Sequence, residues 1–422
     1  MEKLRVIARR ELLRIASLNS LSVILKIATG LVTSKVIALF IGPAGMALTG
    51  NLRNFLTSVE TISTLGFQNG IVKYTTDANS EEALKRVIST VAISLLGIVA
   101  ILSIILFFGA SAFSIMIFDD SREYDFVFRI LALALPWYVA SMLMVSVLNG
   151  LGKFRSVISI NMIGNLLSLL VSVVLIYRYR TAGALAASVI APALMFFVTI
   201  FFARQTIGIS IFKDFSFDRK LIRNLSEYSL MALFSAVFAP LVFVAIRNHV
   251  IDRCGIVEAG WWDGILRISS YYMLFLSTLL AVYFLPNLAK SERLEGMKPV
   301  FWNYFQWILP PFAFGLVLLF FARELVIQIL FTDDFRGMSN LFFWQLTGDF
   351  LKAAALILGY AFFARKLTLA FIVTESFSLT VLWFSSITLS DAYGVEGIVM
   401  AHALTYLIYL LVLIWYFRKS LF

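Results

Sequence analysis

Residues 42–85 read GPAGMALTGNLRNFLTSVETISTLGFQNGIVKYTTDANSEEALK, and this stretch decides the fold. A tight GPAG turn precedes an apolar run of membrane length, and a polar segment follows the run. Within the apolar run, four polar residues follow the i, i+4, i+7, i+11 spacing of one helical face: Arg53, Thr57, Glu60 and Thr64. The stretch predicts a membrane helix whose polar stripe faces water or protein rather than lipid.

The whole chain has the composition of a membrane protein. Of its 422 residues, 60% are hydrophobic and 14% are charged, and the mean hydropathy is +0.90. These values exclude a water-soluble globule of ordinary composition. Hydropathy divides the chain into about twelve apolar segments, each with the roughly 20 residues that a helix needs to cross a bilayer: 11–40, 46–76, 86–110, 126–149, 155–177, 181–204, 221–249, 257–289, 299–322, 337–363, 367–389 and 394–417.

The distribution of basic residues predicts the orientation. Most Lys and Arg residues fall in the connections on the N-terminal side of the membrane, and fewer, Arg247 among them, fall in the opposite connections. The positive-inside rule then places both termini in the cytoplasm. The net charge of +10 reflects this topology and contact with anionic lipid headgroups, and it does not favour a nucleic-acid partner.

Cysteine and histidine are scarce. One cysteine predicts no intrachain disulfide, and two histidines are too few for a histidine-based metal site. His402 lies on an aromatic helix face, so we expect a packed and hydrogen-bonded residue rather than a proton relay.

A break in the apolar pattern divides the chain into two halves. Residues 204–220 read RQTIGISIFKDFSFDRK, which is too short to span and alternates apolar with basic residues. We predict an N-terminal lobe of six helices over 1–204, a cytoplasmic linker over 205–220 and a C-terminal lobe of six helices over 221–422.

Several charged residues lie inside the predicted helices. A mid-helix Arg or Lys costs roughly 2.5 to 3.5 kcal/mol on insertion scales. Four such cations facing lipid would cost on the order of 10 kcal/mol, comparable to the net stability of a typical fold. Interactions with protein groups or water must therefore offset the cost of these cations. The cations are Lys26, Arg53, Arg267 and Lys352, and the acids within the membrane segments are Glu60, Asp263, Asp349 and Glu375.

The residues alone leave two explanations open. The first is structural pairing of Asp263 with Arg267, of Asp349 with Lys352, and of Glu60 with Arg53 or Lys26. The second is a hydrated cavity whose surplus of positive charge suits an anionic ligand at bilayer depth.

Several motifs resemble those of a known family: KIATGLVTSK from Lys26, IGPAG followed by NLR, QNGIVKY ending at Tyr74, VYFLPNL from Val282, and FWQLTGDFLK ending at Lys352. On these motifs the chain resembles the polysaccharide-flippase branch of the multidrug/oligosaccharidyl-lipid/polysaccharide exporter superfamily, and most of all the flippases for O-antigen and enterobacterial common antigen. The resemblance implies an all-α fold with two six-helix lobes around a central cavity, in the bacterial inner membrane.

The same resemblance implies a function. It implies alternating access that moves an undecaprenyl-diphosphate-linked oligosaccharide from the cytoplasmic to the periplasmic leaflet, with the polymerase of the same pathway as a partner. We expect Lys26, Arg53, Arg267 and Lys352 to bind the substrate, although Lys352 falls on a helix behind the cavity. Glu60, Asp263, Asp349 and Glu375 would hold these cations or couple transport to H⁺ or Na⁺. No cofactor and no catalytic residue is expected.

Two other functions make different demands on the sequence. A cation-coupled multidrug antiporter of the same superfamily needs a cavity dominated by acids, whereas cations prevail here. A membrane-embedded glycosyltransferase or polymerase needs a large outer loop or paired catalytic carboxylates, whereas the outer connections are short and the acids accompany cations.

Overall fold

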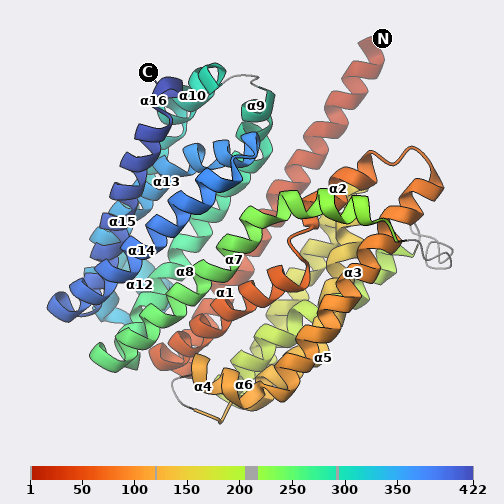
Figure 1. Ribbon diagram of the computed structural model, residues 1–422. Coiled ribbons are helices and arrows are strands. Elements are labelled where there is room, and N and C mark those ends of the chain that lie inside the picture. Colours follow the sequence, from red (N-terminus) through yellow and green to blue (C-terminus); the bar gives the residue numbers. More distant parts are fainter. Residues whose placement is uncertain (1, 119–120, 205–216, 291–293, 422) are drawn as a thin grey trace. The chain divides into compact units, whose positions relative to one another are not determined.

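The computed structural model describes residues 2–118, 121–204, 217–290 and 294–421, and the regular elements within these ranges are all helices (Figure 1). Residues 205–216 of the predicted linker lie outside them. The helices are α1 (Glu2–Ser63), α2 (Gln68–Thr76), α3 (Glu81–Phe108), α4 (Ala110–Ile117), α5 (Asp125–Gly150), α6 (Phe154–Ala203), α7 (Arg219–Cys254), α8 (Ile256–Leu279), η2 (Leu280–Phe284), α9 (Leu285–Lys290), η3 (Leu294–Met297), α10 (Lys298–Trp307), α11 (Leu309–Phe321), α12 (Arg323–Leu330), η4 (Asp333–Leu341), α13 (Phe342–Arg365), α14 (Thr368–Tyr393), α15 (Val395–Tyr416) and α16 (Arg418–Leu421).

The helices account for the predicted crossings. The described residues hold 10 helical stretches long and apolar enough to span a membrane, of which two are 59 and 50 residues long. Each of these two contains a residue with non-helical backbone angles, Gly42 in α1 and Arg180 in α6. Since each long stretch can cross twice, 10 + 2 gives the twelve crossings that hydropathy predicted.

A positive-φ glycine permits the sharp turn in α1. Gly42 has φ 64°, a conformation that costs glycine little and other residues more, and Pro43 follows it. Gly255, with φ 108°, does the same between α7 and α8. These turns let consecutive apolar helices run back across the membrane.

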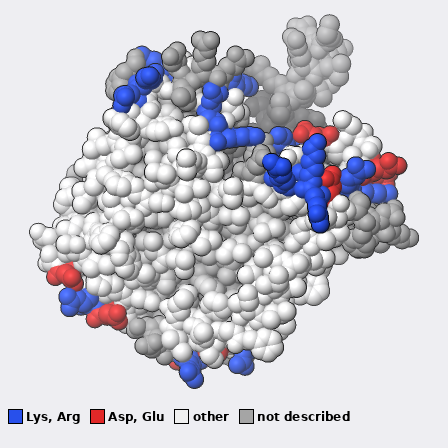
Figure 2. Space-filling model, in the orientation of Figure 1, with Lys and Arg blue, Asp and Glu red and all other residues white. Residues whose placement is uncertain are grey.

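The surface is that of a protein surrounded by lipid. On the face shown in Figure 2, charged side chains gather near the edges, and the area between them is largely uncharged. Large apolar side chains are exposed along the helices, such as Phe108 at 83% and Phe321 at 76%. Such exposure is costly in water and favourable in hydrocarbon.

The chain forms two compact units, one of 1–36 with 55–237 and the other of 37–54 with 238–422. In the first, α5 packs against α3 and α6, and Phe55 and Phe128 meet edge to face at 5.4 Å. In the second, α15 packs against both α13 and α14. The predicted division at residues 205–220 stays a prediction.

Residues 37–54, which we call the Gly42 hairpin, belong to the second unit although both their neighbouring segments belong to the first. Two glycines allow close packing here. A Cβ on Gly260 of α8 would lie 2.1 Å from the Pro43 carbonyl oxygen, and a Cβ on Gly50 would lie 2.2 Å from Asp263 Oδ1. The hairpin and α8 therefore approach each other at backbone distance.

Candidate functional site

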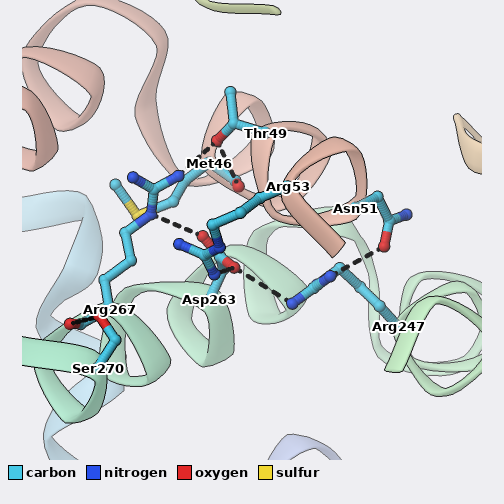
Figure 3. Close-up of polar contacts among 8 residues, drawn as sticks. All are labelled: Met46, Thr49, Asn51, Arg53, Arg247, Asp263, Arg267 and Ser270. Carbon is cyan, nitrogen blue, oxygen red and sulfur yellow. Dashed lines mark hydrogen bonds and ion pairs between the residues drawn. The ribbon is translucent and has the colours of Figure 1, made fainter. Parts of the chain in front are cut away.

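Asp263 on α8 is fully buried and binds three arginines (Figure 3). Its Oδ1 accepts from Arg53 Nη2 at 2.9 Å and from Arg247 Nη2 at 3.2 Å. Its Oδ2 accepts from Arg267 Nε at 2.8 Å. The predicted pair of Asp263 with Arg267, one helical turn apart, is confirmed. We call these four residues the arginine cluster.

The three arginines come from three places in the second unit. Arg53 comes from the Gly42 hairpin, Arg247 from α7, and Arg267 from the same helix as Asp263. The structure therefore pairs Arg53 with an acid distant in sequence, instead of with the predicted partner Glu60.

Neutral side chains of the hairpin complete the network. Arg267 Nη2 donates to Thr49 Oγ1 at 2.8 Å, and Arg247 Nη1 donates to Asn51 Oδ1 at 2.9 Å. Asn51 Nδ2 in turn donates to Asn248 Oδ1 at 2.9 Å. The guanidinium of Arg247 also lies 5.0 Å from the centre of the Trp262 ring, within cation–π range.

The charges of the arginine cluster do not cancel. Three guanidinium groups and one carboxylate give 3 − 1 = +2. Arginine stays charged because the guanidinium group is strongly basic. The side chain of Arg247 has no exposed area and that of Arg267 is 11% exposed, whereas that of Arg53 is 42% exposed. The cluster is thus a buried positive site that reaches the surface of the second unit through Arg53, and it suits an anion.

A second polar cluster surrounds Asp349 on α13. Its Oδ2 accepts from Ser269 and Tyr272 of α8, each at 2.5 Å, and from Gln345 Nε2 at 3.1 Å. Its Oδ1 lies 3.0 Å from His402 Nε2 on α15. The prediction that His402 is packed and hydrogen-bonded is confirmed.

The predicted partner of Asp349 has another neighbour. Lys352 Nζ lies 5.3 Å from the centre of the Tyr406 ring and interacts electrostatically with Glu375 of α14. Asp349 interacts electrostatically with Lys352, as predicted, and its Oδ1 also has the hydrogen-bonded contact with His402. A Cβ on Gly348 would lie 2.3 Å from His402 Cδ2, so the glycine lets the imidazole approach α13.

Glu60 lies in the first unit, in a small cavity that Leu56, Leu131 and Tyr138 help to line. It hydrogen-bonds Tyr138 and interacts electrostatically with Lys26, one of its two predicted partners. Lys26 itself is exposed. The eight predicted site residues thus fall into three groups: Arg53, Asp263 and Arg267; Asp349, Lys352 and Glu375; and Glu60 with Lys26.

Sequence reasoning missed Arg247 as a site residue. The predicted span 221–249 already contains it, and the structure continues α7 to Cys254 with Arg247 inside the helix. The flanking run VFVAIRNHVI was a usable signal, since it is apolar on both sides of the arginine.

These features define a polytopic α-helical membrane protein with buried charge clusters in its second unit. Residues 12–292 match the model of the polysaccharide biosynthesis protein family. Because the match covers more than half of the chain, the chain belongs to that family.

Two curated relatives resemble the chain over nearly its full length. The lipid III flippases of Escherichia coli (strain K12) and Shigella flexneri are each 29% identical over 399 residues, covering 92% of this chain and 94% of theirs.

Solved structures share the fold. An inward-facing multidrug resistance MATE family transporter of the MOP superfamily superposes with a TM-score of 0.79 at 13% identity, covering 95% of this chain and 94% of its own. The lipid II flippase MurJ in an inward closed conformation superposes with a TM-score of 0.70 at 15% identity, covering 96% and 87%. The predicted all-α membrane fold with about twelve spanning helices is confirmed.

Proposed function

We propose that this protein is a flippase that moves an undecaprenyl-diphosphate-linked oligosaccharide from the cytoplasmic to the periplasmic leaflet of the bacterial inner membrane. The observation that carries the proposal is the arginine cluster, whose +2 charge lies within membrane-spanning helices. A diphosphate diester carries about two negative charges at neutral pH, so it would neutralise the cluster. The lipid III flippase relatives support the same substrate class.

The physical task fits the chemistry of this site. The diphosphate and sugars must leave water to cross the bilayer, and guanidinium groups replace water as hydrogen-bond donors to phosphate oxygens. The polyprenyl tail can stay in lipid throughout. No covalent bond forms or breaks, so the protein acts as a transporter and not as an enzyme, and it needs no cofactor.

The remaining charged residues have subsidiary roles in this proposal. Lys26 and Lys352 add positive charge along the path. Glu60, Asp349 and Glu375 hold these cations or couple transport to H⁺ or Na⁺. Both termini are cytoplasmic, and a polymerase of the same pathway receives the exported product.

The multidrug antiporter is the second candidate, because a MATE transporter shares the fold. The arginine cluster disfavours it, since a site with a +2 charge repels cationic drugs.

Gene deletion in the host organism tests the proposal. Loss of the gene should abolish a surface glycan and accumulate its lipid-linked precursor, and the wild-type chain should reverse both changes. Normal glycan export after deletion, together with drug sensitivity that the chain relieves, would contradict the flippase and support the antiporter.

A further inference from the structure

The Gly42 hairpin is attached to the second unit by polar contacts that converge on one place. Its only charged member among residues 37–54 is Arg53, which binds Asp263 at 2.9 Å. Thr49 and Asn51 add bonds to Arg267 and Arg247, and Gly50 lies against the Asp263 carboxylate. Asp263 is thus central to how the hairpin is held.

The same hairpin is continuous with the first unit at both of its ends, at residues 36–37 and 54–55. A transporter that alternates access must move its parts, and a segment that packs with one unit while its flanking residues pack with the other resists such movement until its contacts break. The Gly42 hairpin is such a segment.

The three arginines are not equivalent. Arg247 and Arg267 lie in the body of the second unit with side chains 0% and 11% exposed, whereas Arg53 is 42% exposed and stands on the hairpin. An arriving anion therefore reaches Arg53 first. Asp263 would still keep two buried guanidinium partners after losing Arg53, so the exchange leaves no buried carboxylate unpaired.

We propose that Asp263 is a resident substitute for the substrate phosphate: its ion pair with Arg53 holds the Gly42 hairpin on the second unit, and the substrate diphosphate takes Arg53 in exchange and releases the hairpin. The proposal rests on the proposed function and adds a trigger to it. Net charge supports the exchange. The +2 charge of the arginine cluster and the charge of the diphosphate sum to about zero. A site of low dielectric constant favours this neutral sum over the +2 charge of the cluster alone.

Distance measurements between spin labels test this proposal. Leu39 on the hairpin and Val257 at the start of α8 are exposed and carry the labels as Leu39→Cys and Val257→Cys, with the native Cys254 replaced by Ser. Without ligand, the labelled protein should give one short distance. The probe is farnesyl-diphosphate N-acetylglucosamine, and uncharged farnesol is the matched ligand control.

The probe should add a longer distance, and farnesol should not. Asp263→Asn should raise the long-to-short ratio about tenfold without any probe, because it removes a charge-assisted bond. Arg53→Gln is the second variant, since its exposed site tolerates the change, and it should also lengthen the distance while losing the response to the probe. Asp391→Asn removes an acid that pairs with Arg253 elsewhere in the second unit, and it should change nothing.

Two results would overturn the proposal. One is an unchanged distance in folded Arg53→Gln protein, which would mean that the ion pair does not hold the hairpin. The other is a longer distance in the variants but none with saturating probe, which would mean that the anion does not exchange with Asp263. The distances in the variants are measured without substrate. They therefore test whether the ion pair holds the hairpin even if the protein is not a flippase.

Discussion

Arg53 and Asp263 lie 210 positions apart in the sequence and form an ion pair of 2.9 Å. The pair joins the Gly42 hairpin to α8, and Arg247 and Arg267 give the cluster its excess of positive charge. Both the proposed anion site and the proposed release of the hairpin depend on it.

Gly50→Ala should disturb the arginine cluster through size alone. A Cβ at this position would lie 2.2 Å from Asp263 Oδ1, so the carboxylate or the hairpin must shift. We expect a loss of about 1–3 kcal/mol in the free energy of unfolding, measured by thermal unfolding in detergent, and slower transport. Gly315→Ala on α11, where a Cβ meets nothing within 4 Å, is the control and should be neutral or stabilising. Equal effects of the two changes would refute the packing argument.

Gly348→Ala should displace His402 from Asp349. The new Cβ would lie 2.3 Å from His402 Cδ2, and the expected destabilisation is again about 1–3 kcal/mol. Gly359→Ala on the same helix is the matched control, because a Cβ there has open space around it. A melting temperature that falls for Gly359→Ala but not for Gly348→Ala would contradict the observed packing of α15 on α13.

Asp349→Asn should separate coupling from substrate movement. The amide keeps the size of the side chain and removes its charge, so we expect downhill transport to continue while its stimulation by an imposed H⁺ or Na⁺ gradient disappears. Flux into proteoliposomes with and without the gradient gives the answer. Full stimulation in the variant would remove Asp349 from any coupling role.

Arg247→Ala should be more damaging to stability than a surface arginine change. Arg247 is fully buried, bonded to Asp263 and Asn51, and lies within cation–π range of Trp262. Its loss leaves a cavity and an Asn51 amide oxygen without its donor, at a cost of about 2–5 kcal/mol. Denaturation of Arg247→Ala beside Arg323→Ala, whose side chain is 31% exposed, checks this expectation. Similar midpoints would contradict it.

Sequence reasoning found what lies along a single helix. It gave the crossings, because hydropathy is a property of consecutive residues, and it gave the pair of Asp263 with Arg267, because four residues make one helical turn. It failed where partners come from different helices. Asp349 interacts with Lys352, as predicted, but it also contacts His402 of α15, since Gly348 admits the imidazole, and nothing in the spacing shows that α15 packs there.

The same limit explains Arg53. It shares a helical face with Glu60, which favoured that pair, but the chain changes unit between residues 54 and 55. Arg53 therefore packs with α8, and Glu60 packs with Tyr138 of α5. Periodicity reports which residues share a face and not what that face meets.

Translocation in proteoliposomes shows whether the arginine cluster carries a diphosphate-linked sugar across the membrane. Wild-type protein, Arg53→Ala and Arg336→Ala would be compared with a fluorescent farnesyl-diphosphate N-acetylglucosamine, where Arg336 is an exposed arginine in a surface ion pair.

We predict transport by wild type and by Arg336→Ala, and a loss of about tenfold or more in Arg53→Ala, because one charge-assisted phosphate contact is removed. Transport by Arg53→Ala at the wild-type rate would contradict the assignment of the site. No transport of this lipid by the wild type, with uptake of a drug cation instead, would contradict the flippase itself.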